Sequence, residues 1–251
     1  MRAGSAAVLV LALVVSGCAG DGEEPATSVA TSARSTSSTG TVPASPTPTA
    51  TATRTPDGAL TTSALEGTLI TAADLPAGFQ PGAEEAGSSA DAGCLALTVA
   101  LDRIAVESRA RARFVVQDEV GASGVLSKAL SDGDVTVLRR GLNRFATALQ
   151  SCKRVDVTDA DGARSRLEVV SDRVRSSDLV ERQVNFTASG SVGGAGVRYP
   201  YRVAYSVSLV GNTLAVLAGF EVGESATPVV DGLGDVDATF VERLVAAGAL
   251  G

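Results

Sequence analysis

Residues 199–222 read YPYRVAYSVSLVGNTLAVLAGFEV. Large apolar or aromatic residues stand at every second position before Gly211, which is the period of a β-strand with one buried face. Gly211 and Asn212 separate this run from a second alternating run, and such a pair predicts a tight hairpin turn. The stretch therefore predicts two long antiparallel strands. The residues expected on their buried faces are Tyr199, Tyr201, Val203, Tyr205, Val207 and Leu209, then Leu214, Val216, Ala218, Phe220 and Val222.

Further strands are predicted on both sides of this hairpin. Residues 109–117 alternate arginine with apolar side chains, which is typical of a half-buried strand. Residues 120–130 are ambiguous, although a strand suits their context. Residues 154–159 and 164–171 predict a hairpin that turns through Asp161 and Gly162. Residues 180–188 read as one more strand, which continues through a glycine-rich loop into residue 199.

Four helical segments are expected from apolar residues spaced three and four apart. Residues 71–75 predict a single turn that begins at Thr71 and stops at Pro76. A short helix is expected over residues 94–104 and another over 235–247. The clearest helix covers residues 134–152, with Ser131 and Asp134 as an expected capping pair and these residues on its apolar stripe: Val135, Leu138, Leu142, Phe145, Leu149 and Cys152.

These elements predict one α+β domain over residues 63–251. It would contain an antiparallel sheet of about six strands with helices packed on it. No internal repeat is present, and some 190 residues are enough for a sizeable core.

The N-terminal residues have the order of parts of a secretory signal. Arg2 supplies a positive charge, residues 6–15 are apolar, and small residues follow. The apolar run is too short for a membrane-spanning helix, which needs about 20 residues. Residues 15–18, Val-Ser-Gly-Cys, resemble the bacterial lipobox. We therefore predict that residues 1–17 are a signal peptide and that Cys18 carries a diacylglyceryl anchor; the alternative is an ordinary secretory signal in which Cys18 is incidental.

Residues 18–62 predict a disordered tether between the anchor and the domain. They are dominated by Thr, Ser, Ala, Pro and Gly, with almost no large apolar side chains. Such a segment cannot offset the entropy of ordering its backbone. As a flexible coil it would hold the domain about 35 to 40 Å from the anchor. The Thr/Ser/Pro run is either a bare spacer or a carrier of O-linked sugars.

The remaining cysteines predict one disulfide. With Cys18 lipidated, the exported domain keeps Cys94 and Cys152, and an even number outside the reducing cytosol indicates a bridge. On the chain-entropy model a loop of this length contributes about 4 kcal/mol. A metal or redox pair is the competing interpretation, and it is disfavoured because neither a CxxC motif nor a histidine is present to complete a site.

Several of these features together resemble a known family. Residues 69–79 read LITAADLPAGF at the start of the domain, Cys94 precedes a strand, a helix ends on Cys152, and a Gly-Asn hairpin comes late. This pattern resembles the actinobacterial sensor-domain lipoproteins related to the PknH-like extracellular domains of mycobacterial kinases. The resemblance covers roughly residues 65–250. It implies an α/β/α sandwich that senses a ligand outside the cell.

Composition excludes several kinds of chemistry. The chain has no histidine, which rules out Ser-His-Asp and Cys-His catalysis and histidine metal sites. Neither G-x-S-x-G nor S-x-x-K occurs. With 28 acidic and 21 basic residues the net charge is -7, so neither nucleic acid nor anionic lipid head groups attract the chain. We predict no catalytic residues, no metal and no cofactor.

Two near-matches to known motifs have simpler interpretations. Asp159, Asp161, Gly162 and Glu168 fall at four positions of a calcium-binding loop, but the flanking residues read as strands and a hairpin turn fits better. The glycine-rich residues 193–196 lead into a strand, whereas a phosphate-binding loop leads into a helix.

Two features remain for binding. Tyr199, Tyr201 and Tyr205 share one strand face, and they either face a ligand or pack in the core. The arginines within residues 109–113 either contact an anionic envelope component or form a solvated face. We expect a non-enzymatic binding or sensing protein on the outer face of the membrane, whose ligand is a small molecule or an envelope component. The alternatives are a structural or chaperone-like envelope protein and a carboxylate-dependent hydrolase.

Overall fold

The computed structural model describes residues 54–55, 57–82, 101, 103–158, 164–172, 174–193, 197–224 and 227–250. The expected signal peptide, Cys18, most of the expected tether and Cys94 lie outside these residues, as does nearly all of the helix expected over 94–104. No helix in the described part of the chain is both long and apolar enough to cross a membrane.

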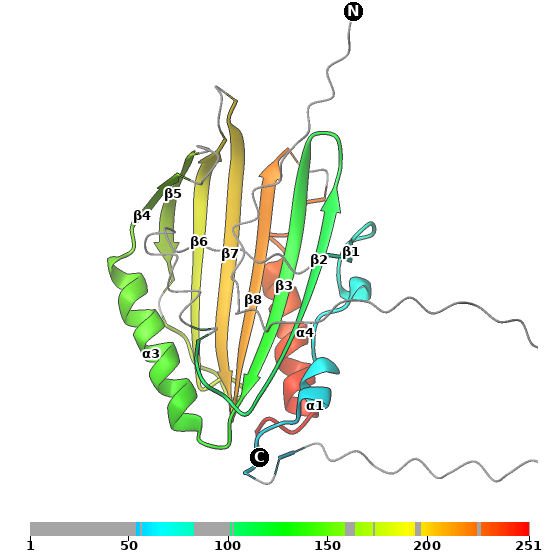
Figure 1. Ribbon diagram of the computed structural model, residues 1–251, viewed down its shortest axis with the longest axis vertical. Helices are drawn as coiled ribbons and strands as arrows, with labels where there is room; N and C mark the ends of the chain where they lie inside the picture. The colour runs from blue at the N-terminus through cyan, green and yellow to red at the C-terminus, as the bar shows by residue number, and fades with distance from the viewer. Residues whose placement is uncertain are drawn as a thin grey trace, which may run out of the picture. The chain divides into compact units, whose positions relative to one another are not determined.

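The domain is built on one open antiparallel sheet with helices on both faces (Figure 1). The sheet has eight strands in the order β1-β2-β3-β8-β7-β6-β5-β4. In chain order the elements are α1 (Thr62–Glu66), η1 (Ala72–Asp74), β1 (Gln80–Pro81), β2 (Ser108–Gln117), β3 (Gly121–Ser131), α3 (Val135–Ser151), β4 (Arg154–Thr158), β5 (Arg164–Ser171), β6 (Arg182–Val192), β7 (Tyr199–Val210), β8 (Thr213–Gly223) and α4 (Leu233–Ala246). The α+β class is therefore confirmed.

The strand count of about six was too low. The segment that sequence left ambiguous, 120–130, is a full strand from Gly121 on: β3 (Gly121–Ser131) pairs with both β2 and β8. The sequence analysis also missed β1, a strand of two exposed residues that pairs with Phe114 and Val115 of β2. Two residues cannot display an alternating pattern, so periodicity could not identify this strand.

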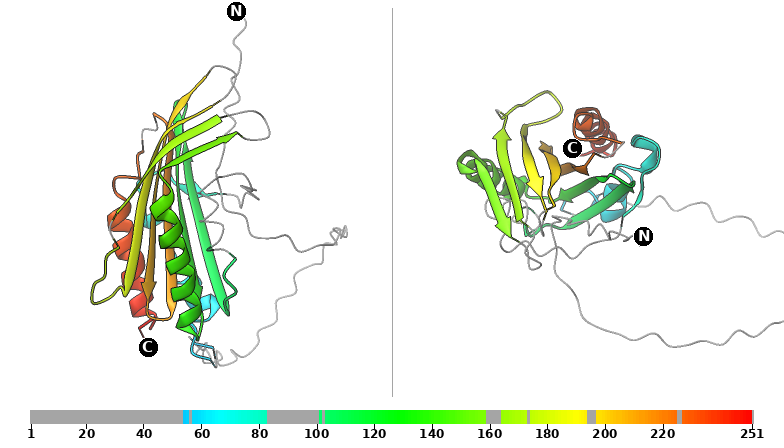
Figure 2. Two further views of the ribbon diagram at one scale, coloured as in Figure 1. Left: turned by 90° about the vertical axis from the view of Figure 1, so that its left-hand side faces the viewer. Right: turned by 90° about the horizontal axis from the view of Figure 1, so that it is seen from above.

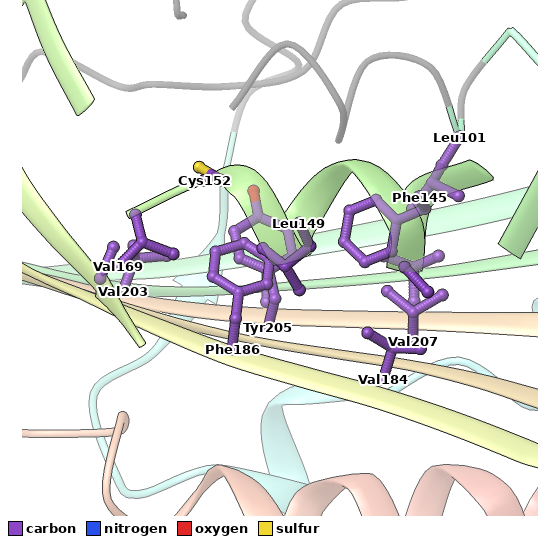
Figure 3. Packing of buried hydrophobic residues seen from close by; sticks show 14 of the residues in the cluster. Leu101, Phe145, Leu149, Cys152, Val169, Val184, Phe186, Val203, Tyr205 and Val207 are labelled. Carbon is purple, nitrogen blue, oxygen red and sulfur yellow. The ribbon is translucent and has the colours of Figure 1, made fainter. Parts of the chain in front are cut away.

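Each face of the sheet has its own apolar core. Side chains of α3 pack on one face, over strands β4 to β8, and Phe145, Leu149 and Phe186 belong to this cluster. Side chains of α1, η1 and α4 pack on the other face, over β2, β3, β8 and β7. Figure 3 shows α3 on one side of the strands and α4 on the other. Because strand residues alternate between the two faces, even-numbered residues of β7 such as Ala204 face α4, whereas odd-numbered ones such as Tyr205 face α3.

The packed part of the chain begins earlier than residue 63. Ala59 and Leu60 are fully buried. The backbone N–H of Leu60 donates to Ser131 Oγ at 3.0 Å, and Ser108 Oγ donates to the Leu60 carbonyl. The expected boundary at residue 62 is therefore corrected, because these contacts place residues that composition assigned to the tether within the domain.

The caps of two helices also differ from expectation in detail. Asp134 alone caps α3, accepting the Thr136 N–H at 2.9 Å, while Ser131 lies in β3 and bonds elsewhere. The turn expected at residues 71–75 is present as the 3-10 helix η1, whose Asp74 carboxylate accepts from both the N–H and the hydroxyl of Thr71 at 2.8 Å. The same carboxylate binds Arg243 of α4 at 2.6 Å, which joins η1 to α4.

Candidate functional site

Two of the three tyrosines proposed as ligand-facing lie in the core beneath α3 (Figure 3). The Tyr205 ring stacks on Phe186 with centroids 4.8 Å apart, and Phe186 in turn meets Phe145 of α3. Tyr201 is also buried, and burial, with a smaller effect of Tyr205, raises its pKa. Tyr199, at the start of β7, is 37% exposed. Tyr201 and Tyr205 are therefore core residues. That any of the three tyrosines contacts a ligand stays a prediction.

The arginines of β2 lie on the strand face opposite Ala110, as the alternation predicts. Arg109 and Arg111 are exposed and Arg113 is half-buried. Arg109 donates to the Ile104 carbonyl at 3.1 Å. Arg109 of this row therefore bonds to the segment that precedes β2.

Cys152 is buried, as expected for a cysteine in a disulfide within the core. It follows the last residue of α3, is 3% exposed and belongs to the same cluster as Leu149 and Phe145. Because Cys94 lies outside the described residues, the Cys94–Cys152 bridge stays a prediction.

The calcium-loop interpretation finds no support in strand pairing. β4 and β5 pair directly as a hairpin, with Arg154 opposite Glu168. Residues 159–163, which would hold the remaining ligands, lie outside the described part of the chain. Among the residues that are described, no three acidic or cysteine side chains gather in a way that could hold a metal ion.

Polar and charged side chains gather on a different surface, formed by strands β4, β5 and β6. On the side of the sheet that α4 covers, the apolar cluster takes no described residue from β4, β5 or β6. Figure 2 shows β5 and β6 reaching past α4 on this side. We call this surface the open face. It consists of Arg154 and Asp156 of β4, Arg164, Arg166, Glu168 and Val170 of β5, and Thr187, Ser189 and Ser191 of β6.

Register brings these side chains together from three strands. Arg166 is opposite Asp156 on one side and Ser191 on the other. Val170 is opposite Thr187, which is opposite Ala204, a residue packed under α4. Paired residues in an antiparallel sheet point to the same face. The open face therefore continues onto β7, the strand whose Ala204 packs under α4.

Asp156 holds two arginines on the open face. Its Oδ1 lies 3.2 Å from Arg164 Nε, and its Oδ2 lies 3.3 Å from an Arg166 terminal nitrogen. Partial burial raises the pKa of Asp156, but Arg164 and Arg166 outweigh that effect and lower it overall. Asp156 is therefore kept ionised, which is the wrong direction for the general acid that a carboxylate hydrolase needs.

A second charged cluster stands where the open face meets the segment before α4. Arg202 of β7 binds Asp231 and lies 3.3 Å from Glu221 of β8. The other oxygen of Glu221 accepts the backbone N–H groups of Val229 and Val230, at 2.8 and 2.7 Å. The hydrogen bond with Arg202 lowers the pKa of Asp231. This cluster fixes the chain that leads into α4 beside the open face.

A buried polar group lies farther along the sheet, between α4 and strands β6 and β7. Asp237 of α4 accepts Gln183 Nε2 at 2.7 Å, and Gln183 also donates to Ser206 Oγ at 3.1 Å. Burial raises the pKa of Asp237, although hydrogen bonds with Ser206 and Gln183 act in the opposite direction. Two neighbouring polar atoms, Ser208 Oγ and Asn185 Oδ1, are buried without a hydrogen-bond partner. Buried polar atoms without partners are rare in folded proteins, so these two need an additional partner.

The buried Asp237 should make stability depend on pH in a particular direction. A carboxyl whose pKa is raised by folding binds its proton more tightly in the folded state, so the stability it contributes at low pH is lost as pH rises through the folded pKa. We expect Asp237→Asn to remove this loss. The difference in free energy of unfolding between variant and wild type should grow with pH by up to about 1.4 kcal/mol per pH unit, the slope for one proton.

Urea denaturation across the acid and neutral range measures this slope. Asp74→Asn is the matched control, because Arg243 and Thr71 outweigh burial and lower the pKa of Asp74. Its contribution is therefore present at neutral pH and lost as pH falls, giving the opposite slope. Equal pH slopes of the free energy of unfolding for the two variants would contradict a raised pKa of Asp237 in the folded protein.

Comparison with known proteins gives a likeness of fold. No family model and no curated protein matches the chain. Among solved structures, the chain is similar to the extracellular domain of PknH from Mycobacterium tuberculosis, with a TM-score of 0.54 and 13% sequence identity. The match covers 76% of this chain and 99% of that one. The PknH-like fold is therefore confirmed, and membership of the sensor-domain lipoprotein family stays a prediction.

Proposed function

We propose that this chain is a lipid-anchored extracytoplasmic protein whose domain binds a ligand without transforming it. Two features support this function besides the open face. Residues 15–18 resemble a lipobox, which is the signal for an anchor on Cys18. The fold is similar to that of a protein described as an extracellular domain. The Cys94–Cys152 bridge, if it forms, suits the same oxidising compartment.

The open face is the observation that carries the binding role. It is a sheet surface beside α4 that presents polar and charged side chains instead of a second apolar core. Beyond the open face, on the α4 side of β6 and β7, Asn185 and the buried Ser208 hold polar atoms that no described group satisfies. A bound molecule or an ordered water would provide the missing hydrogen bonds. Such a surface can orient a ligand through hydrogen bonds and ion pairs.

Native mass spectrometry of the protein, purified in mild detergent from its own envelope, tests this role. We expect a co-purified ligand mass, and we expect Ser208→Ala to lower the fraction of protein that carries it. The same substitution should not weaken the ligand-free protein, because it removes a buried hydroxyl that has no partner. Ser165→Ala is the matched control, since Ser165 is buried on the α3 side of β5.

The outcomes separate binding from its alternatives. A ligand retained equally by both serine variants would place the binding site away from Ser208. Protein that carries no ligand in any preparation would contradict the binding role and favour the structural or chaperone-like alternative.

A further inference from the structure

We propose that two copies of this chain pair along the outer edge of β4, which joins their sheets into one. The partner is a second copy of the same chain, related to the first by a two-fold axis through Val155. This pairing goes beyond the proposed binding function. Only its stability on a membrane rests on the proposed anchor.

β4 ends the strand order at one side of the sheet. Within the described part of the chain it pairs with β5 and with no other strand. Figure 1 shows β4 as the outermost strand on the left, with α3 below it. None of its five residues is a proline, which would remove a backbone donor, or a glycine. The outer side of such a strand can accept a further strand by backbone hydrogen bonds.

The pairing with β5 fixes which backbone groups of β4 point outward. The Val169 N–H donates to the Lys153 carbonyl at 3.0 Å, which continues the β4–β5 ladder by one residue. Hydrogen-bonded pairs recur at every second residue of an antiparallel ladder. Odd-numbered residues of β4 such as Val155 therefore bond to β5. The backbone groups of Arg154 and Asp156 point the other way, toward the edge.

Charge then selects one register for a second copy. In a two-fold pair, outward-pointing residues must lie opposite outward-pointing residues of the other copy. An axis through Arg154 would place two arginines opposite each other, and an axis through Asp156 would place two carboxylates opposite each other. An axis through Val155 places each Arg154 opposite the Asp156 of the other copy, twice in the interface. Opposite charges across strands stabilise a sheet, whereas like charges destabilise it.

The ion pairs already present leave room for this contact. Asp156 binds Arg164 and Arg166, and both belong to β5, on the side of β4 away from the edge. The side chain of Asp156 is still 37% exposed. Arg154 is exposed and also has an interaction within the chain. Neither group needs to be free, because a carboxylate has about four acceptor sites and a guanidinium about five N–H donors.

Pairing of this kind joins the two open faces into one surface. Arg154 and Asp156 lie on the open face, and residues opposite each other in an antiparallel sheet point to the same face. Both open faces therefore lie on one side of the joined sheet, and both α3 helices lie on the other side. A ligand longer than one open face can then contact two copies at once.

The length of β4 predicts a weak interface in free solution. A pair of five-residue strands is small beside the roughly 1,200 Å² that stable interfaces bury. Two chains anchored in one membrane meet at a much higher effective concentration than two chains in solution. We therefore expect the pair to form mainly on the membrane surface.

The lysine content of the chain allows a direct test. The chain has two lysines: Lys128 is buried, and Lys153, directly before β4, is exposed. In the proposed register the two Lys153 Cα atoms lie about 14 Å apart, within reach of an amine-reactive cross-linker. A peptide in which Lys153 is linked to another Lys153 can come only from two chains. We expect disuccinimidyl suberate to yield this peptide from the full-length protein in phosphatidylcholine vesicles.

Charge variants test the register itself. Arg154→Asp turns two attractive pairs into repulsive ones and should lower the yield of the linked peptide about tenfold. Arg140→Asp makes the same change on the exposed side of α3 and should leave the yield unchanged. Asp156→Arg should lower the yield as Arg154→Asp does. An equimolar mixture of the Arg154→Asp and Asp156→Arg proteins should restore it, because each β4 then carries the charges that complement the other.

Absence of the Lys153–Lys153 peptide from the wild-type protein would overturn the proposal. Equal yields from Arg154→Asp and Arg140→Asp would do so as well. So would a mixture that gives no more linked peptide than its two components, when circular dichroism shows that both variants are folded. Protein that does not enter the vesicles would refute only the anchor, and the same peptide measured in concentrated solution would then decide the pairing.

Discussion

A domain that starts at residue 63 is expected not to fold, whereas one that starts at residue 53 should fold fully. The shorter chain lacks Leu60, which is completely buried against the core of α1 and α4. Removing such a side chain costs about 2 to 5 kcal/mol. It also leaves the buried hydroxyl of Ser108 without its Leu60 partner, at about 1 to 3 kcal/mol for an unsatisfied group. Ser131 loses its bond to Leu60 but still bonds to the Asn212 carbonyl and to Thr213. These losses are comparable with the lower end of the stability of a typical domain, about 5 to 15 kcal/mol.

Further contacts of the same segment would be lost with it. Arg54 donates to the carbonyls of Gly58 and Gly248, which ties the start of the domain to the end of α4. Asn212 Nδ2 donates to the Gly58 carbonyl at 2.6 Å. Thr61 caps α1 by accepting the Ala64 N–H. These bonds hold the segment across the ends of β3 and β8 (Figure 1).

Circular dichroism and urea denaturation of the two truncated chains measure the effect. Within the longer chain, Leu60→Ala should lower the free energy of unfolding by about 2 to 5 kcal/mol. Leu250→Ala is the matched control, because Leu250 is 48% exposed and its truncation should cost little. Cooperative unfolding of the chain that starts at residue 63, with the midpoint of the longer one, would refute the revised boundary.

The strands that sequence predicted well are those with two distinct faces. β7 alternates large apolar residues with small or polar ones, because α3 covers one side and smaller residues such as Ala204 and Ser206 lie under α4 on the other. Its pairing with β8 through Gly211 and Asn212 follows from the turn chemistry, since Gly211 has a φ of +52° that a glycine adopts readily. Here local propensity and tertiary packing favour the same structure.

Segments whose structure depends on distant partners could not be predicted in this way. Ala59 and Leu60 are two apolar residues at the end of a threonine-rich stretch, and they show no period. Their burial depends on Ser108 and Ser131, which are about 50 and 70 positions away. Ser131 was expected to cap α3 because it stands before a helix, and only the pairing of β3 with β8 reveals its other role.

The open face was missed because each of its strands looks ordinary alone. Arginine, serine and threonine on the outer side of a strand are typical of a solvated surface. Only the register that puts Arg166 beside Ser191, together with the position of α4, makes these residues one surface. One signal was available in the sequence. Asp237 falls on the buried stripe of its helix between Leu233 and Phe240, and a carboxylate at such a position indicates a polar contact inside the fold.

Membrane attachment is expected to depend entirely on one atom, the sulfur of Cys18. Cys18→Ser should abolish acylation, because a hydroxyl at this position of a lipobox-like signal cannot form the thioether. Two acyl chains make membrane residence stable, and the chain's net charge of -7 does not favour binding to anionic lipid head groups. The variant should therefore accumulate uncleaved or appear outside the membrane fraction.

Metabolic labelling with a fatty acid, followed by detergent phase partition, measures both steps. The wild type should carry label and enter the detergent phase, and the Cys18→Ser protein should do neither. Ser16→Ala is the matched control, since it keeps a small residue in the signal and leaves the cysteine intact. Unchanged partition of unlabelled Cys18→Ser protein into detergent would refute lipidation at this residue. It would then favour an ordinary secretory signal, and the domain would need another means of reaching the envelope.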